Sequence, residues 1–251
     1  MATELTQTDQ LRGGRIHLCE LAGLEIRDCE VSGLTIVDCY GGDVSLGGDF
    51  GRVVVNDVDV TAYVEAELDR RHPARVLVRE ADSPADVRAA WDAIVVMWAE
   101  TVERARLLGE SALQRRVDGE WSFVETQRHL LFASDAWVGS AVLEEESPFH
   151  RWGYPAGSTS PEQAASAGLD LGATPTLDEV LAARAERMAV VRRLVDRLDE
   201  AELDRVCARR PAPWYADEEY VVRRCVRVVL NEEVEHHRYA ARDLAVLQTQ
   251  A

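Results

Sequence analysis

Two side chains that commonly bind metal ions, Glu233 and His237, interrupt an apolar stripe near the end of the chain. The stripe lies on a helix predicted from about Glu218 to Leu247, and its spacing of three and four residues is that of one helix face. Its apolar members are Val222, Val226, Val229, Ala240 and Leu244. Residues four apart lie one turn apart, so both side chains could touch one cation. A buried carboxylate or imidazole needs a hydrogen bond, an ion pair or a metal. The pair is therefore a candidate half-site for a metal.

His129 could supply a third ligand from an earlier predicted helix. That helix begins at Ser122, where Glu125 has the spacing of a capping box, and runs to about Leu143. The side chains on the same face as His129 are small, which leaves room for an ion; they are Thr126, Ala133 and Ala136. Three protein ligands with open positions are what a catalytic divalent site requires, and imidazoles with one carboxylate suit zinc, nickel or iron(II).

Two alternatives stay open at this site. His236 could replace His237, because neighbouring residues lie about 100° apart around a helix and a small rotation exchanges them. The three groups could also form a buried hydrogen-bonded cluster without an ion. Glu125 lies one turn before His129, but its capping-box spacing favours a structural role at the helix start.

Four amphipathic helices are expected to position these residues. The first begins at Ser83-Pro84, which supplies an N-cap and a first-turn proline, and the third begins at Thr176 with Glu179 in capping-box spacing. Helices of this length and pattern are typical of a bundle. The segment from residue 144 to 175 is rich in Gly, Pro and Ser, and loops of this length are usually functional or mobile.

Two stretches, GEWSFVETQRHLLFASDAW and VLNEEVEHHRYAARDLAVL, resemble the signature helices of the DinB-like superfamily, which includes S-transferases that use mycothiol or bacillithiol. The resemblance covers about residues 81–251. It implies a four-helix bundle that holds a divalent metal, commonly zinc or nickel, and acts on a small-molecule substrate or thiol. In that family one histidine comes from the second helix and two, four apart, come from the last. By position His129 and His237 match the first and last of these, and Glu233 replaces the middle histidine.

The first 60 residues carry a period of five that neither a helix nor an ordinary strand produces. One apolar register holds Leu11, Ile16, Leu21, Ile26, Val31 and Ile36, and a second holds Cys19, Leu24, Cys29, Leu34, Cys39 and Val44. This pattern resembles the pentapeptide-repeat family, which implies a right-handed, four-sided β-helix with both registers inside. Only about two coils fit, so the solenoid is expected to depend on the following domain for stability. The cysteines in this region are interpreted as small apolar fillers.

These elements predict an α+β chain in three parts. Residues 1–60 form a short pentapeptide β-helix, residues 61–80 a linker helix with an extended segment, and residues 81–251 a DinB-like four-helix bundle. Asn56-Asp57 is the turn signal that ends the repeats.

Composition excludes several classes of partner. The chain has 251 residues, with 28 basic and 45 acidic side chains and a formal charge of −17, which opposes both nucleic acids and anionic lipids. No apolar run is long enough for a membrane span and no secretory signal is recognised, so the expected location is the cytoplasm. The five cysteines are then expected to be reduced thiols.

The sequence supports two functional hypotheses. The first is a metal-dependent enzyme, a thiol S-transferase or a hydrolase, with zinc or nickel on His129, Glu233 and His237. The second is a non-catalytic, stress-associated binding or scaffold protein in which the metal is structural or absent. A homodimer formed through faces of the bundle is a further expectation.

Overall fold

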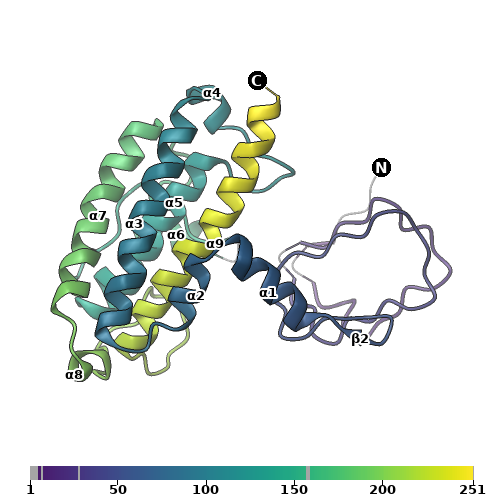
Figure 1. Cartoon of the computed structure of the whole chain (residues 1–251), viewed down its shortest axis with the longest axis horizontal. Helices are drawn as coiled ribbons and strands as arrows, with labels where there is room; N and C mark the ends of the chain where they lie inside the picture. The colour runs from purple at the N-terminus through teal and green to yellow at the C-terminus, as the bar shows by residue number, and fades with distance from the viewer. Residues whose placement is uncertain (1–4, 7, 28, 157–158, 251) are drawn as a thin grey trace. The chain divides into compact units, whose positions relative to one another are not determined.

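The computed structural model describes every residue except 1–4, 7, 28, 157–158 and 251. The chain divides into two compact units, Met1–Gly51 and Arg52–Ala251. The larger unit is helical and contains every predicted ligand (Figure 1).

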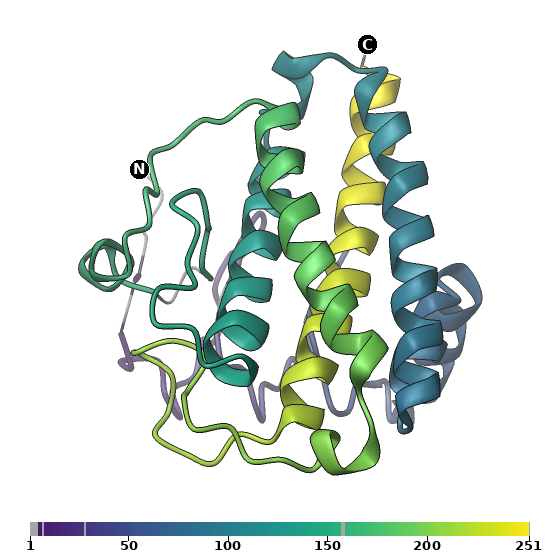
Figure 2. The same ribbon diagram turned by 90° about the vertical axis from the view of Figure 1, so that its left-hand side faces the viewer.

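The bundle of the larger unit is built from four long helices, which run alongside one another in Figure 2. They are α3 (Pro84–Arg106), α5 (Phe123–Ser134), α7 (Leu177–Arg197) and α9 (Val222–Thr249), and α5 runs on into a π-helical segment, η1 (Asp135–Val142). The helices contact one another in the ring order α3, α9, α5, α7 and back to α3. The predicted helical bundle is thus confirmed. Its last helix begins at Val222, four residues later than the sequence suggested.

Capping boxes start three of the four helices; the sequence predicted two of them, and at the third it predicted only the N-cap Ser83 and the first-turn proline. In each, a hydroxyl accepts a hydrogen bond from the third helical amide while a carboxylate accepts one from the amide of the cap residue. The pairs are Ser83 with Asp86, Ser122 with Glu125, and Thr176 with Glu179. The second pair fixes the residue at which α5 begins, and so the position of His129 along the axis of the bundle.

The inward faces of these helices form one apolar core. Its largest fully buried side chains include Trp91, Ile94, Leu130, Leu131, Leu194, Leu230 and Leu244. Each belongs to α3, α5, α7 or α9, so burial of these side chains holds the four helices together.

Shorter elements complete the larger unit. A two-stranded hairpin pairs β1 (Val54–Val55) with β2 (Val58–Asp59), and Asn56 and Asp57 between them have left-handed φ of 48° and 64°, as a tight hairpin turn requires. The remaining helices are α1 (Thr61–Arg71), α2 (Ala74–Arg79), α4 (Glu110–Leu113), α6 (Pro161–Ser166) and α8 (Glu200–Leu203). Helix α2 packs against α3 and α9.

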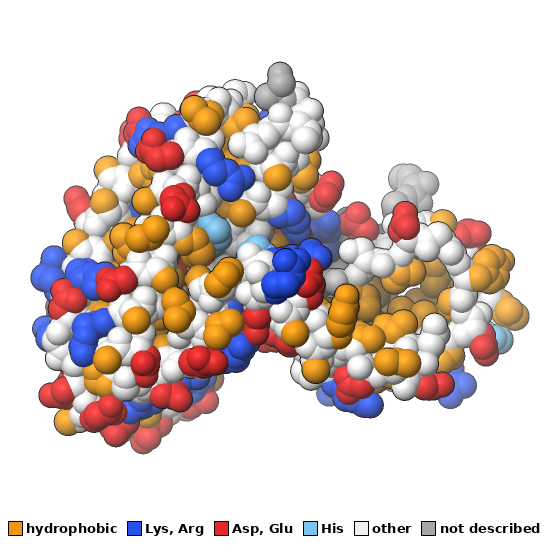
Figure 3. Space-filling view, viewed as in Figure 1, with side chains coloured by type: hydrophobic (Ala, Val, Ile, Leu, Met, Phe, Trp, Pro, Cys, Tyr) orange, Lys and Arg blue, Asp and Glu red, His pale blue; other side chains and the backbone are white. Residues whose placement is uncertain are grey.

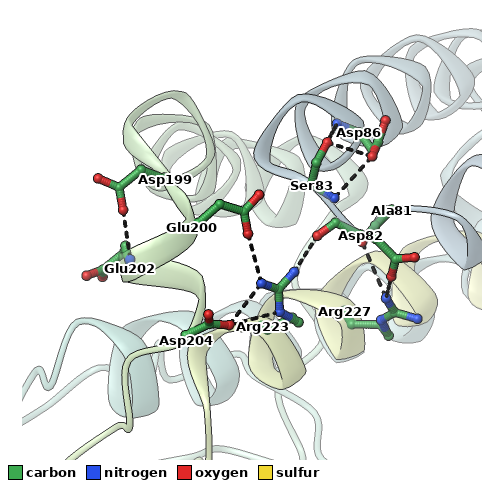
Figure 4. A network of polar contacts seen from close by, with 10 residues as sticks. All are labelled: Ala81, Asp82, Ser83, Asp86, Asp199, Glu200, Glu202, Asp204, Arg223 and Arg227. Carbon is green, nitrogen blue, oxygen red and sulfur yellow. Dashed lines mark hydrogen bonds and ion pairs between the residues drawn. The ribbon is translucent and has the colours of Figure 1, made fainter.

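Two arginines on the first turns of α9 bind the neighbouring connections (Figure 4). The Arg223 guanidinium donates to the Glu200 carboxylate at 3.1 Å, to Asp204 at 2.9 Å and to the carbonyl oxygen of Asp82. One turn later, Arg227 donates to the Asp82 carboxylate at 2.7 Å. The network ties the start of α9 to α8 and to the connection between α2 and α3.

Turns in the smaller unit recur every ten residues, which is two of the five-residue periods of the sequence. Gly13, Gly23 and Gly33 have φ of 68°, 76° and 79°, a region that favours glycine. The amides of Leu24 and Leu34 close matching turns onto the carbonyl oxygens three residues earlier, at 3.0 and 2.9 Å.

A packed β-helix is not found among the described residues of this unit. They contain no strand, and the side chains of the first predicted apolar register lie open (Figure 3): Leu11 is 57% exposed, Ile26 54% and Ile36 63%. A solenoid coil buries its inner face only against neighbouring coils, and about two coils supply few neighbours. The ten-residue repeat is therefore observed, whereas the predicted β-helix is not supported.

Among the described residues, none of the helices combines the length and the apolar character needed to cross a membrane.

Candidate metal centre

Three metal-binding side chains meet where α5 faces α9: His129, Glu232 and His236. Their ligand atoms all lie within 4.8 Å of one another. One carboxylate oxygen, Glu232 Oε2, lies 3.0 Å from Nε2 of His129 and 3.0 Å from Nε2 of His236. Glu232 and His236 are four residues apart, one turn along α9, so both reach the same point on α5. His129 was a predicted ligand and His236 an open alternative to His237, whereas the interpretation of the sequence did not include Glu232.

Glu233, predicted as a ligand, points elsewhere and is paired with an arginine. Arg184 on α7 donates from its two terminal nitrogens to the two oxygens of Glu233, at 3.1 and 2.9 Å. The two side chains are 3% and 1% exposed. A carboxylate held in this way by a guanidinium has both oxygens engaged inside the core, and it has its counter-charge without a metal.

His237 also faces away from His129. Its Nε2 shares a hydrogen bond of 2.7 Å with the Thr101 hydroxyl on α3, and its ring meets Trp98 edge to face at 5.0 Å. Burial lowers the pKa of His237 to about 4, so the ring is neutral near pH 7. It lines a cavity of about 240 Å³ together with His72 and Met97. The geometry corrects the predicted set: Glu233 and His237 do not join His129.

The predicted pair on α9 and the pair that lies beside His129 differ by one residue along the helix. Glu233 and His237 lie on the middle of the inward stripe of α9, facing α7 and α3, whereas Glu232 and His236 lie about 100° around the helix and face α5. The middle of the stripe is core, and its polar groups are satisfied there by protein partners. The edge of the stripe is half-buried, with side chains of Glu232 and His236 that are 29% and 22% exposed. A site that must receive a ligand belongs at such an edge.

A signal in the sequence could have revealed the partner of Glu233. On α7, steps of three and four residues along the apolar stripe lead from Leu181 through Arg184 to Met188. An arginine therefore interrupts one inward stripe just as a glutamate interrupts another. Opposite charges on two buried stripes predict an ion pair in place of a metal ligand.

The hydrogen bond made by Nδ1 of His129 determines which nitrogen carries the proton in the neutral ring. Nδ1 lies 2.8 Å from the carbonyl oxygen of Tyr154, which can only accept, so Nδ1 carries a proton. In the neutral ring Nε2 then bears a lone pair, which faces a carboxylate oxygen at 3.0 Å. Two acceptors at this distance repel unless a cation lies between them, either a proton on the imidazole or a metal ion.

Arg128 holds the loop that supplies this carbonyl. Its buried guanidinium donates to the carbonyl oxygens of Trp152, Asp170 and Ala173, at 2.9, 2.7 and 2.6 Å. The backbone of Arg128 also accepts from the amide of Tyr154 at 3.1 Å. The residue next to His129 on α5 therefore fixes the segment that orients the His129 ring, an arrangement common around metal-binding histidines.

Trp121 covers the two histidines from the side. Its ring is stacked on His236, with centroids 5.5 Å apart and planes at 18°, and lies 4.5 Å from the ring of His129. Tyr154 meets the same indole edge to face at 5.8 Å. These contacts restrict the rotation of both imidazoles. Glu125, by contrast, accepts from Arg116 and from the amide of Ser122, which is the structural role that its spacing indicated.

Electrostatics keep the Glu232 carboxylate ionised. Burial works to raise the pKa of Glu232, but hydrogen bonds from His129 and His236 outweigh it, so that the pKa lies well below the ordinary value of 4.5. An ionised carboxylate between two imidazole nitrogens is a ligand set for a divalent cation.

The spacing of the donor atoms fits such an ion. Ligands about 2.0–2.1 Å from a tetrahedral zinc ion lie about 3.4 Å apart. Glu232 Oε2 lies 3.0 Å from each imidazole nitrogen, and all three ligand atoms lie within 4.8 Å of one another. Two imidazoles and one carboxylate also match the His₂Glu donor set used at catalytic zinc sites. The residues present therefore fit a divalent metal.

A sequence model of the DinB superfamily matches residues 93–240, which include every member of the cluster. The chain belongs to the DinB superfamily. The DinB match covers α5, α7 and the greater part of α3 and α9, so the predicted resemblance of the bundle is confirmed. It does not reach the N-terminal unit, for which the resemblance to pentapeptide repeats finds no support. No curated protein and no solved structure matches the chain.

Proposed function

We propose that the protein is a metal-dependent enzyme of the DinB class, a low-molecular-weight-thiol S-transferase or a hydrolase, with zinc or nickel on His129, Glu232 and His236. The observation that carries the proposal is that the ligand atoms of His129, Glu232 and His236 lie within 4.8 Å of one another at a partly exposed position. Two imidazoles and one carboxylate suit a divalent cation.

A divalent ion bound there would lower the pKa of a coordinated water or thiol and so supply a nucleophile near neutral pH. The protein's own residues prepare that site. Tyr154 fixes the tautomer of His129 through its carbonyl oxygen, and Trp121 holds both rings. Glu232 brings one negative charge, so the two imidazoles and the carboxylate leave a divalent centre with a net positive charge that favours an anionic thiolate or hydroxide.

The exposure of the cluster supports a catalytic site over a closed structural one. His129 is 7% exposed and anchors the inner side, whereas the partly exposed Glu232 and His236 leave the outer side accessible to solvent. Structural zinc sites use four protein ligands, and catalytic sites use three with an open position. Three ligands with an open side are therefore the arrangement for a small-molecule substrate.

An activity screen on metal-loaded protein tests this function. Wild type is incubated with mycothiol, bacillithiol or glutathione and an electrophile, and with ester and amide substrates without thiol. We expect metal-dependent turnover in one of these reactions, reduced at least about 100-fold in Glu232→Ala, since removing a ligand removes the activated nucleophile. Glu235→Ala, on the same helix outside the cluster, is the matched control. Equal rates in wild type and Glu232→Ala would overturn the proposal.

A second function, as a binding or scaffold protein, is favoured by one observation in the N-terminal unit. Its regularly spaced apolar side chains, including Leu24 and Leu34 at 55% and 54% exposed, form a surface suited to association. Under this proposal the N-terminal repeats bury these side chains against a partner, and a metal in the bundle is structural. Retained metal with no turnover in the full screen supports this second function.

A further inference from the structure

Two buried cysteines lie in contact at the end of the bundle, far along α9 from the metal centre. The Sγ atoms of Cys207 and Cys225 are 3.9 Å apart. Cys225 is fully buried in the first turn of α9, and Cys207 is 9% exposed in the segment that precedes the helix. The other cysteines, Cys19, Cys29 and Cys39, are exposed in the smaller unit.

The backbone around the pair is held in place from both sides. The amide of Cys207 donates to the carbonyl oxygen of Tyr220 at 2.8 Å, and the amide of Val222 donates to that of Arg205 at 2.9 Å. Together they flank an antiparallel bridge between Val206 and Val221. The Arg223 side chain adds its ion pairs to α8 (Figure 4). The two sulfurs therefore meet because these backbone hydrogen bonds hold the two segments together.

The two thiols differ in reactivity. A hydrogen bond from Cys225 lowers the pKa of the Cys207 thiol, burial opposes this, and the charge of Arg205 adds to the lowering. For Cys225 the hydrogen bond to Cys207 and burial both raise the pKa of the thiol. The thiolate is the nucleophile, so Cys207, which is also the one with access to solvent, reacts first.

We propose that Cys207 and Cys225 are a redox-active pair that forms a reversible intramolecular disulfide when the protein reacts with hydrogen peroxide. The Cys207 thiolate attacks one peroxide oxygen, the O–O bond breaks, and after protonation the products are a sulfenic acid on Cys207 and one water. The sulfur of Cys225 then attacks the Cys207 sulfur, the S–O bond breaks, and the second water leaves. The two thiols lose two electrons and two protons in total, and the peroxide is reduced to two waters.

The two sulfurs are already close. They lie 3.9 Å apart and must approach to about 2.05 Å to form the bond. The bridge would join residues 18 apart and so close the segment that carries Trp214 and Tyr215 onto α9. A low-molecular-weight thiol would reverse it by exchange at Cys207, which is 9% exposed whereas Cys225 is fully buried.

Peptide mapping of full-length wild type tests this site directly. Protein treated with hydrogen peroxide and then alkylated is digested with trypsin, which releases residues 206–209 with Cys207 and residues 225–227 with Cys225. We expect these two peptides to appear linked, about 2 Da lighter than the sum of the free peptides, and to separate after reduction. Free, alkylated Cys207 and Cys225 under conditions that oxidise Cys19 and Cys39 would overturn the proposal, as would links from Cys207 to those exposed cysteines.

A variant separates the order of the two steps. In Cys225→Ser the sulfenic acid on Cys207 has no resolving thiol, so we expect dimedone to label Cys207 in this variant several-fold more than in wild type. Cys207→Ser should leave Cys225 reduced at the same peroxide dose, because that thiol is fully buried. Dimedone labelling of Cys225 in Cys207→Ser, with none of Cys207 in Cys225→Ser, would contradict the proposed order and the assignment of Cys207 as the peroxide-reactive thiol.

Discussion

Arg184 and Glu233 form a two-pronged ion pair inside the bundle, with N–O distances of 3.1 and 2.9 Å and almost no exposed surface. The pair joins α7 to α9, which do not pack side by side in the ring of helices. The guanidinium also lies 5.5 Å from the centre of the Trp98 ring. This relationship explains why a glutamate in the middle of the inward stripe of α9 is a structural residue.

Replacing one member of this ion pair should lower the stability of the fold. Arg184→Met leaves the Glu233 carboxylate buried without a counter-charge, and we expect a loss of about 3–5 kcal/mol in the free energy of unfolding. Arg184→Met combined with Glu233→Met should recover most of that loss, because an apolar pair of similar volume needs no counter-charge. Urea unfolding of wild type, Arg184→Met, Glu233→Met and the double variant measures these effects. If the losses of the two single variants simply add in the double variant, the two side chains are not coupled.

Trp121 is expected to contribute to metal affinity without touching the ion. Trp121→Ala frees the rings of His129 and His236 to rotate, and we expect the affinity for zinc to fall about tenfold, the lower end of the range for residues that orient ligands. Trp121→Phe keeps a stacking ring and should stay near wild type. Calorimetric titration with zinc measures both variants. An unchanged affinity in Trp121→Ala would mean that the imidazoles are held by their hydrogen bonds alone.

Asp135 should make stability depend on pH in an unusual direction for an aspartate. Burial raises the pKa of Asp135 from 3.8 to about 7, against the opposing effects of the His150 amide and of Arg187. Between these values the folded protein holds a proton that the unfolded chain releases, so the contribution of this group to stability falls as pH rises through the window. The Asp135→Asn side chain does not titrate, so this pH-dependent contribution to stability is lost. We expect the variant to gain stability relative to wild type, by up to a few kcal/mol, between about pH 4 and pH 8. Parallel pH profiles in urea unfolding would contradict it.

The bundle should fold and bind metal without the smaller unit. Every member of the cluster and the whole apolar core lie within Arg52–Ala251. We expect a protein truncated to residues 52–251 to keep the helical circular dichroism signal and the zinc affinity of the full chain. The sequence pattern suggested that the repeats depend on the bundle, and the reverse dependence is not expected. Loss of zinc binding on truncation would show that the repeats support the site.

Local chemistry made most of the helical unit predictable from sequence. Ser122 with Glu125 and Thr176 with Glu179 mark helix starts that the structure reproduces, because a capping box satisfies backbone groups within four residues. Asn56-Asp57 also predicted a turn correctly, because the signal for a tight turn lies in the turn residues themselves. The apolar stripe of α9 was also identified correctly, and Val222, Val226 and Leu244 are buried.

Long-range pairing made the ligand set harder to predict. A helix presents neighbouring residues about 100° apart, so choosing Glu233 over Glu232 requires knowledge of which helix lies on each side. That knowledge depends on Arg184, which is 49 residues away along the chain, and on His129, which is 103 residues from Glu232. The structure of the N-terminal repeat was difficult to predict for a different reason. Its spacing is regular, but burial of Leu11 or Ile36 depends on neighbouring coils that a short repeat does not provide.

The metal content of His236→Ala and His237→Ala tests the central claim most directly, because the two residues are adjacent and only one faces His129. Both variants and wild type are purified without a histidine tag, equilibrated with zinc or nickel, and analysed by mass spectrometry of the metal. We expect about one equivalent per chain in wild type and His237→Ala, and less than about a tenth of that in His236→Ala. Metal lost from His237→Ala but kept in His236→Ala, or equally absent from all three proteins, would contradict a centre built on His129, Glu232 and His236.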